Sequence, residues 1–422
     1  MAIATAAAMV FLALFALEIT GYLANPYVGL LVFVTVPAVF LAGLALVPLG
    51  AWRTARRRAR GLAAPEWPVI DLRDPHQRTV VAGVFALTIV NVLIVSMGAY
   101  GGVHYMESEA FCGRVCHVME PQAVAHKAWP HADVACTQCH VGPGAGAYIE
   151  GKLAGTRQLF HVLTDRVPMP VAPPQRLIQS SRVACAQCHS ASARAGDELR
   201  VIPDYASDEA NTETLTTLRL RVGDRFAGIH RHIGMELEYV AAGDITATIP
   251  VVRLRTPAGV REYVADGATR DAVGTTRTME CIDCHNRPAH TFSATPQRAI
   301  DAAVARGAIP RQLPFARREA VAAVTVAYAT PEAAVTGIAA RLNAFYGARA
   351  GVDAALLARA IAGSQDAWSR NVFPAMKVTW GTYPNHLGHV DTQGCFRCHD
   401  DRKAVDGAVL SQECELCHTL PE

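Results

Sequence analysis

The stretch that decides the fold is Cys136-Thr-Gln-Cys139-His140. Four more pentapeptides repeat its Cys-x-x-Cys-His pattern: Cys185-Ala-Gln-Cys188-His189, Cys281-Ile-Asp-Cys284-His285, Cys395-Phe-Arg-Cys398-His399 and Cys414-Glu-Leu-Cys417-His418. This spacing is the attachment signature of c-type haem, because two thiols add to the two vinyl groups of one porphyrin while the adjacent histidine binds the iron. Zinc sites and disulfides also use paired cysteines, but neither explains a histidine after every second cysteine.

The remaining two cysteines form a sixth, wider motif, Cys112-Gly-Arg-Val-Cys116-His117, so all twelve cysteines are used. Three intervening residues still permit two thioether bonds, but they shift the direction in which His117 points. We therefore predict six covalently bound haem c groups. Five have the common geometry, and the iron at the wider motif is ligated differently.

Long apolar stretches dominate the N-terminal part of the chain. Hydrophobic residues make up 51% of the 422 residues and the net charge is only +2, which argues against a nucleic-acid-binding or disordered protein. Residues 6–24, 28–49 and 79–100 each approach the length of about 20 residues that a membrane-spanning helix needs. No Lys or Arg precedes Arg53, so the basic start of a cleavable signal peptide is missing. We predict three N-terminal transmembrane helices.

Charge predicts the orientation of these helices in the cytoplasmic membrane. The loop 51–78 is rich in arginine, and such loops stay in the cytoplasm, which also places the N-terminus there. Everything after about Tyr100 is then periplasmic, in the oxidising compartment where c-type haems are attached. The spans contain no histidine to ligate a haem between helices, so we expect them to act as an anchor. Glu18 and Asn91 are polar residues within spans and could contact a quinol or another helix.

Sequence periodicity divides the part that follows the anchor. Residues 212–265 alternate apolar and polar with a turn at 256–259, which predicts antiparallel strands. From 296 to 370 apolar residues recur at three- and four-residue intervals, which predicts helix with a stop at Gly347. The predicted fold is a membrane-anchored multihaem cytochrome, with a mostly helical or irregular haem-packed periplasmic part and a small antiparallel β insert. Its expected domains are the three-helix anchor (1–100), a three-haem domain (101–200), the β-rich insert (201–275) and a helix-rich three-haem domain (276–422).

Histidines outside the motifs are candidates for the second axial ligand of each iron. The best placed lie close before or between motifs and are His131, His290, His386 and His389. His230 and His232 lie in the predicted β insert, where alternation puts both rings on one face of a strand. Of these two we favour His230.

Several short stretches occur in an order typical of one family. They are Phe111-Cys-Gly-Arg-Val-Cys-His-Val-Met-Glu-Pro121, Pro130-His131, and His140-Val-Gly-Pro-Gly-Ala-Gly146 followed by Lys152 and Gly155. From the third predicted span to roughly residue 190, the chain thereby resembles the NapC/NirT family of quinol-oxidising cytochromes. Three C-terminal stretches, Asp283–His290, Asn371–Pro374 and Trp380–His386, resemble its extended three-span branch in metal-reducing bacteria rather than the four-haem members.

The resemblance implies roles for individual residues. Met119 corresponds to the family's ligand of the first haem iron, and Lys152 to the lysine that binds a quinol oxygen. The family also has an aspartate six or seven residues after that lysine, where this chain has Gln158 and Leu159. Gln158, His161 and Glu150 are the alternatives for a proton acceptor, and the ordinary pKa of a histidine suits His161 to that role.

The expected function is that of a quinol dehydrogenase. The protein would oxidise membrane quinol, specifically menaquinol, and pass electrons through six haems to a periplasmic cytochrome or reductase during anaerobic or extracellular respiration. Two alternatives remain open. The chain could be an electron-relay subunit of a larger complex without its own quinol site, or a periplasmic reductase of nitrite or hydroxylamine with a vacant iron position. Its partners are expected to be membrane lipid, the quinol pool and a redox protein, with no nucleic acid.

Overall fold

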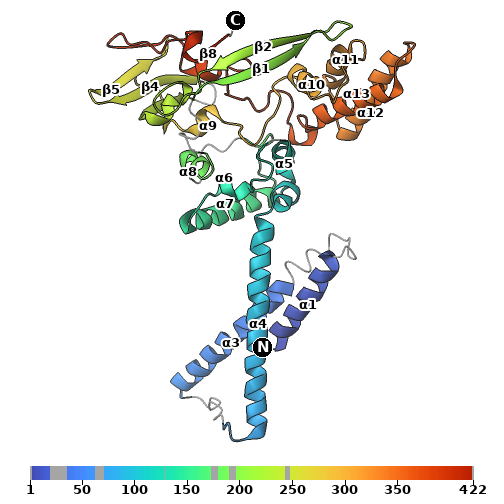
Figure 1. The fold of residues 1–422 in the computed structure, drawn as a ribbon. Coiled ribbons are helices and arrows are strands. Elements are labelled where there is room, and N and C mark those ends of the chain that lie inside the picture. The colour runs from blue at the N-terminus through green and yellow to red at the C-terminus, as the bar shows by residue number, and fades with distance from the viewer. Residues whose placement is uncertain are drawn as a thin grey trace. The chain divides into compact units, whose positions relative to one another are not determined.

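The computed structural model describes residues 2–19, 36–61, 71–128, 130–172, 179–189, 196–242 and 248–420. These residues form two compact units, Met1–Met106 and Glu107–Glu422 (Figure 1). The boundary lies at the end of a long helix, six residues beyond the predicted end of the anchor. The four-domain division based on sequence periodicity remains a prediction.

The described residues of the first unit form three helices: α1 (Ala2–Ile19), α3 (Val36–Ala59) and α4 (Pro75–Met106). Within the described ranges, two helices and not the predicted three are long and apolar enough to cross a membrane: Ala38–Ala59 and Pro75–Met106. The first predicted span begins within α1, but 20–24 lie outside the described residues, as does the start of the second span at 28–35. Helix α3 ends ten residues after the predicted end of the second span, because alanine and arginine favour continuation of the helix. Arginine side chains in the last turn are also stabilised by the helix dipole.

Helix α4 begins with a local N-terminal cap. The Oδ1 atom of Asp74 accepts a hydrogen bond of 2.9 Å from the backbone N–H of His76, and Pro75 occupies the first helical position. Most of the apolar side chains of α4 are exposed, as expected of a helix surrounded by lipid. Asn91 is buried, and its Nδ2 atom donates to Thr5 Oγ1 of α1 at 3.0 Å. Asn91 therefore joins two helices, whereas the Glu18 side chain lies outside the described part.

The second unit begins with short helices around the cysteine motifs. They are η2 (Phe111–Val115), η3 (His117–Met119), α5 (Glu120–Lys127), α6 (Cys136–His140), α7 (Ala145–Leu163), α8 (Ser181–Ala186) and α9 (Cys281–Cys284). Gly142 and Gly144 both adopt positive φ angles, which lets the chain turn sharply between α6 and α7. Motifs and connecting turns thus form a largely irregular region.

Among the residues that the structure describes, eight strands form two antiparallel sheets. One has the order β1-β2-β8, from β1 (Glu198–Tyr205), β2 (Glu213–Leu220) and β8 (His418–Thr419). The other has the order β6-β3-β4-β5-β7, from β3 (Leu237–Ala242), β4 (Thr248–Thr256), β5 (Gly259–Val264), β6 (Thr275–Thr278) and β7 (Lys403–Ala404). The predicted β insert is therefore not self-contained, because a C-terminal strand at one edge completes each sheet.

Four helices form a bundle of their own: α10 (Pro296–Ala305), α11 (Ala316–Val324), α12 (Pro331–Gly347) and α13 (Ala354–Ser369). The side chains of Thr295, Thr330 and Asp353 cap α10, α12 and α13. Their apolar faces enclose one core that includes Ile338 and Trp368. The helical pattern expected from 296 to 370 is confirmed, and α12 ends at Gly347.

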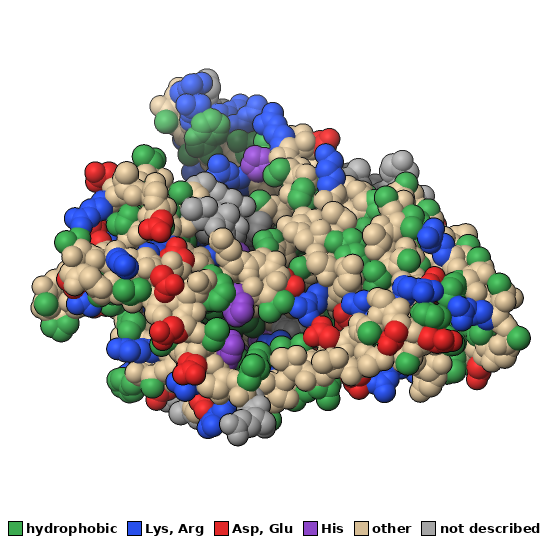
Figure 2. Space-filling model, turned by 90° about the horizontal axis from the view of Figure 1, so that it is seen from above, with side chains coloured by type: hydrophobic (Ala, Val, Ile, Leu, Met, Phe, Trp, Pro, Cys, Tyr) green, Lys and Arg blue, Asp and Glu red, His purple; other side chains and the backbone are tan. Residues whose placement is uncertain are grey.

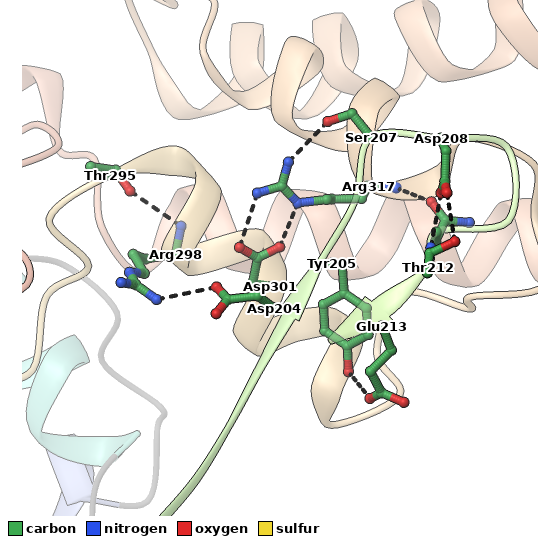
Figure 3. Close-up of polar contacts among 11 residues, drawn as sticks. Asp204, Tyr205, Ser207, Asp208, Thr212, Glu213, Thr295, Arg298, Asp301 and Arg317 are labelled. Atoms are coloured by element: carbon green, nitrogen blue, oxygen red, sulfur yellow. Dashed lines mark hydrogen bonds and ion pairs between the residues drawn. The ribbon is translucent and has the colours of Figure 1, made fainter. Parts of the chain in front are cut away.

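A buried polar network fixes this bundle to the β1–β2 hairpin (Figure 3). Arg317 of α11 donates to both carboxylate oxygens of Asp301 on α10, at 2.7 and 3.1 Å, and to Ser207 beyond β1 at 3.0 Å. Asn211, whose φ of 51° suits asparagine, donates to the carbonyl of Leu313 at 2.8 Å. The helical bundle and the hairpin are thereby held as one body.

Candidate functional site: six cysteine motifs and their histidines

The wide first motif forms a π-helical turn, η2. The backbone N–H of Cys116 donates to the carbonyl of Phe111 at 3.2 Å, a bond five residues long that accommodates one residue more than an α-helical turn. Gly113 lies against α5, where a Cβ atom added to it would meet the Cβ of Ala123 at only 2.5 Å. Glycine inside this motif is therefore required by close packing. The extra residue changes the backbone, while both thiols stay on one turn.

Thiols of consecutive motifs contact one another. A hydrogen bond joins Cys112 to Cys136, and another joins Cys185 to Cys281. These bonds lower the pKa of Cys136 to about 7 and that of Cys281 to about 6, while they raise the pKa of Cys112 and Cys185. The first motif is thus adjacent to the second, and the third to the fourth.

The other consecutive motifs are also close enough for their thiols to interact. Burial is the main cause that raises the pKa of Cys139, Cys284 and Cys417, and a thiol of an adjacent motif adds to each shift. That thiol is Cys188 for Cys139, and Cys395 for both Cys284 and Cys417. The six motifs therefore follow one another in space in the order in which they occur in the sequence.

A shared carboxylate holds the third and fourth motifs together. Glu280, which caps α9, accepts hydrogen bonds from the backbone N–H of Ser181 at 2.8 Å and its hydroxyl at 2.9 Å. It also accepts one from the Ser180 hydroxyl. Arg182 donates to the carbonyls of Ile233 and Met279 at 3.0 and 2.9 Å. Hydrogen bonds among residues of both motifs and of the segment between the two sheets thereby hold the third and fourth motifs in one fixed arrangement.

The fifth motif is fixed to its surroundings by two arginines. Arg397 donates to the carbonyl of Asp283 in the fourth motif. The buried Arg402 donates to both oxygens of Asp400, at 2.6 and 2.8 Å, and to the carbonyl of Ile249 in β4 at 2.7 Å. A guanidinium group has five donors in one plane, so it can bridge a carboxylate and backbone carbonyls at once. The Cys395–His399 turn is thereby positioned on the five-stranded sheet.

Five motif histidines each face a histidine from outside the motifs. Ring centres lie 6.1 Å apart for His140 and His290, 5.9 Å for His189 and His131, 6.3 Å for His285 and His230, 5.9 Å for His399 and His232, and 6.1 Å for His418 and His389. A further ring, that of His126, lies 5.9 Å from His290. Figure 2 shows histidine side chains in a hollow on one face of the molecule.

This spacing suits two imidazoles bound to one metal from opposite sides. A ligating nitrogen lies about 2 Å from a metal and the ring centre about 1 Å behind it, so two opposed rings have centres roughly 6 Å apart. All five pairs fall within 0.3 Å of that value, between 5.9 and 6.3 Å. The donor set, paired imidazoles beside paired thiols, therefore fits c-type haem.

Backbone hydrogen bonds set the tautomer of four of these rings. The Nδ1 atoms of His131, His232, His290 and His399 face the carbonyls of Pro288, Ile229, Gln122 and Ser411 at 2.8 to 3.0 Å. A carbonyl oxygen only accepts, so Nδ1 carries the hydrogen and Nε2 keeps its lone pair. Fixing one nitrogen so that the other can bind a metal is usual for histidine ligands.

Burial keeps several of these rings neutral. It is the main cause that lowers the pKa of His140, His232, His285 and His290, to about 4 for His290. Neighbouring histidines lower each value further, because two imidazolium charges repel. Neutral imidazole is the form that binds a metal.

The structure differs from the sequence-based prediction for the pair His230 and His232. They lie in a 3-10 helix, η4 (Ile229–Gly234), and not on one face of a strand. The strand ends because Gly223 and Gly228 have positive φ angles and their backbones pack closely together. Residues two apart in a helix with three residues per turn are rotated by about 240°. The two rings consequently reach different motifs, and His232, the less favoured of the two in sequence, also has a partner.

The other predicted ligands are placed as follows. His386 is buried, and its backbone N–H donates to Asn286 Oδ1 beside the fourth motif at 2.9 Å. His117 is exposed, and Met119, the last residue of η3, is half-buried. His126 was not among the predicted ligands, although it is buried and contacts His290. His126 lies ten residues before the second motif, and no sequence pattern there indicated the direction of its side chain.

Lys152 lies next to the first motif. It forms an ion pair of 3.1 Å with Glu107 Oε1, its Nζ atom lies 4.9 Å from the centre of the Tyr148 ring, and its charge acts on the Cys112 thiol. Glu107 was not predicted, because it is 45 residues away in sequence. Helix α7 is continuous from Ala145 to Leu163, so Gln158 and His161, six and nine residues after Lys152, point to other sides.

A cavity with several charged side chains in its lining lies beside the first motif. Its volume is about 530 Å³, and His117, Arg114 and Glu120 are among the residues that line it. The ion pair of Glu109 and Lys127, 3.0 Å apart, also borders this cavity. Neither thiol of the motif is part of its lining.

Paired thiols, opposed histidines and an N-terminal apolar anchor define a membrane-anchored multihaem c-type cytochrome. Residues 74–199 match the N-terminal region of the NapC/NirT cytochrome c family. The chain is 38% identical to the cytochrome c-type protein ImcH of Geobacter sulfurreducens over 439 aligned positions, which cover 99% of this chain and 86% of that protein. The chain therefore belongs to the NapC/NirT family of c-type cytochromes, and its function is electron transfer.

A second relative matches only a short part of the chain. The cytochrome c nitrite reductase subunit NrfH of Nitratidesulfovibrio vulgaris is 35% identical over 60 residues, which cover 14% of this chain and 37% of that protein. No solved structure matches.

Proposed function

We propose that this protein oxidises membrane menaquinol and transfers the electrons through six c-type haems to a periplasmic cytochrome or reductase. The observation that carries the proposal is the continuous order of the six motifs in space, which begins beside Lys152. When bound, the haems supply one-electron redox chemistry. The protein's own contribution is to position them, to select their ligands and to bind quinol. The proposed orientation places the arginine-rich loop 51–78 in the cytoplasm and the second unit in the periplasm.

The histidine pairs suggest a specific ligand set. We assign His290 to the second motif, His131 to the third, His230 to the fourth, His232 to the fifth and His389 to the sixth, each opposite the motif histidine. At the first motif we retain Met119, supported by the exposure of His117. Five opposed pairs leave no vacant position at those motifs, which disfavours the nitrite or hydroxylamine reductase alternative.

Purified full-length protein in lipid nanodiscs tests the proposal. A haem assay should give six haems per chain, and added menaquinol analogue should reduce them. In Lys152→Ala, the rate of reduction by quinol should fall at least about 100-fold, while dithionite still reduces every haem. Lys127→Ala, which removes a lysine that lies near the same motif but pairs with Glu109, is the matched control and should stay close to wild type. If menaquinol fails to reduce the wild-type protein, the relay-subunit alternative is correct.

A further inference from the structure

We infer that Glu107 is the proton acceptor of quinol oxidation, working as a pair with Lys152. The inference rests on the proposed function and deepens it, because it assigns a catalytic residue that neither the motifs nor the family pattern indicates. The sequence left the proton acceptor undecided between Gln158, His161 and Glu150. The fold brings a different carboxylate to the lysine.

Helical geometry separates the three sequence candidates from Lys152. At 100° per residue, Glu150, Gln158 and His161 are rotated from Lys152 by about 160°, 120° and 180° around α7. His161 also lies about 13 Å further along the helix axis. None of the three can approach the same quinol oxygen as the lysine without unwinding a helix that is continuous over 19 residues.

The contact between Lys152 and Glu107 has the properties of a substrate site. The exposed fractions of the two side chains are 36% and 29%, so the pair is neither buried nor fully solvated. An ion pair with this exposure contributes little stability, so a quinol hydroxyl can come between the two groups at little cost. The ring of Tyr148 beside the ammonium group offers an aromatic face against which a quinol ring can stack.

The position of the pair along the chain and beside the motif supports the same role. Glu107 is the first residue after α4, which is apolar enough to cross the membrane and ends at Met106. Lys152 acts electrostatically on Cys112, the first haem-attachment thiol. The pair therefore stands beside the motif that begins the series, and Glu107 directly follows α4 in the sequence.

The proposed reaction removes two protons and two electrons from one quinol. Lys152 donates a hydrogen bond to one quinol oxygen, and the Glu107 carboxylate takes the proton as the quinol O–H bond breaks and a carboxyl O–H bond forms. A c-type haem, when bound at the first motif, would supply the one-electron oxidant. Glu107 releases its proton to water and then accepts the second one, so that one quinol yields one quinone, two protons and two electrons.

The competing interpretation is that the ion pair only fixes α7 to the start of the second unit at Glu107. The chain provides a matched control in Glu109 and Lys127, an ion pair of 3.0 Å with side-chain exposures of 35% and 56%. This control pair has the same residue types and also lies near the first motif, but it borders the cavity lined by His117, Arg114 and Glu120. Any general effect of removing a salt bridge near the motif should appear equally in both pairs.

The experiment uses the full-length holoprotein in nanodiscs and the variants Glu107→Gln, Glu107→Asp, Lys152→Gln, Glu109→Gln and Lys127→Gln. A fluorescent hydroxyquinoline N-oxide, an analogue of quinol, reports binding by quenching, and stopped-flow absorbance reports reduction by menaquinol analogue. We expect Glu107→Gln to change the Kd of the analogue less than threefold and to lower the saturating rate about 100-fold, with loss of one ionisation from its pH profile. Glu107→Asp should recover part of the rate. Lys152→Gln should raise the Kd at least about tenfold.

Each outcome decides the question. A Glu107→Gln variant with the wild-type saturating rate and pH profile overturns the inference, as does an equal rate loss in Glu109→Gln. If Glu107→Gln weakens binding as much as Lys152→Gln while the saturating rate is kept, Glu107 only positions the lysine and the inference is again wrong. If the wild-type holoprotein binds no analogue and is not reduced by quinol, the proposed function itself fails. Haem content measured for every variant separates these results from misfolding.

Discussion

Single hydrogen bonds decide which ring nitrogen of a histidine is available in this protein. A backbone carbonyl opposite Nδ1 forces the hydrogen onto that atom and leaves Nε2 as the donor atom for a metal. His232 and His399 face each other, and both are held in this way, by Ile229 and Ser411. The fifth motif therefore has two oriented imidazoles before any cofactor is attached.

Replacement of His232 tests this orientation. In His232→Ala, we expect the iron proposed at the fifth motif to lose its second strong-field ligand and to change from low spin to high spin, because the remaining pairs are untouched. Electron paramagnetic resonance and magnetic circular dichroism of the oxidised protein measure the spin states. The adjacent Arg231→Ala, which removes an exposed side chain from the same turn, should leave all spectra unchanged. Unaltered spectra in His232→Ala would refute the assignment.

At the scale of secondary structure, one short helical turn accommodates the extra residue of the first motif. The π turn η2 spans Phe111–Val115, and its Gly113 packs against Ala123 of α5. The second and fourth motifs form α-helical turns, α6 and α9, and the fifth and sixth motifs form 3-10 turns, neither of which has room for an inserted residue. The wider motif therefore depends on a neighbouring helix that is placed closely enough to require glycine.

The substitution Gly113→Ala should destabilise this contact. Its new Cβ would lie 2.5 Å from the Cβ of Ala123, and overpacking of this kind costs about 1–3 kcal/mol. We expect a lower urea midpoint and a lower yield of protein with the full haem complement. The double variant Gly113→Ala, Ala123→Gly should recover most of both losses, as measured by circular dichroism and a haem assay. Failure of the second substitution to rescue the first would mean that the glycine serves another purpose.

At the scale of the whole second unit, residues distant in sequence hold consecutive motifs together. Glu280 accepts hydrogen bonds from Ser180 and Ser181, about 100 residues earlier, and Arg402 connects the fifth motif to β4. The two short C-terminal strands β7 and β8 each complete a sheet built from the middle of the chain. The order of the motifs in space is thus maintained by contacts between parts that no local sequence pattern connects.

The Glu280 contact should make the stability of this unit sensitive to acid. Burial alone would raise the pKa of Glu280, but hydrogen bonds from Ser180 and Ser181 and the charge of Arg182 lower it below the ordinary value of 4.5. A lowered folded-state pKa means that the stabilisation is present above pH 4.5 and is lost as the pH falls through the folded-state value. The wild-type unfolding temperature should therefore exceed that of Glu280→Gln at pH 7, and the difference should shrink as the pH falls below 4.5 and through the lowered folded-state pKa.

Differential scanning calorimetry across pH 3 to 7 measures this effect. The control is Glu236→Gln, a carboxylate in an exposed ion pair with Arg255, which should show little difference at any pH. A Glu280→Gln variant that remains less stable by the same amount at pH 3 would show that the side chain acts by packing and not by its charge.

By itself, the sequence determined the chemistry of this protein. Thioether attachment needs two thiols and a histidine on one turn, so the twelve cysteines, the six motifs and the class of cofactor can be read from local spacing. Apolar length predicted a membrane anchor, although it gave three spans where two helices qualify within the described part. Helix periodicity from 296 to 370 was reliable because its cause, an apolar stripe with caps, is also local.

Only the tertiary structure decided which distant groups meet. His232 contacts His399 because a 3-10 turn, and not a strand, rotates its ring away from that of His230. Lys152 lies on the continuous helix α7 and contacts Glu107, which is 45 residues away in the sequence. Such pairings depend on how elements pack, which spacing along a chain does not encode. Lys152, beside the first motif, thereby has a carboxylate partner that no motif contains.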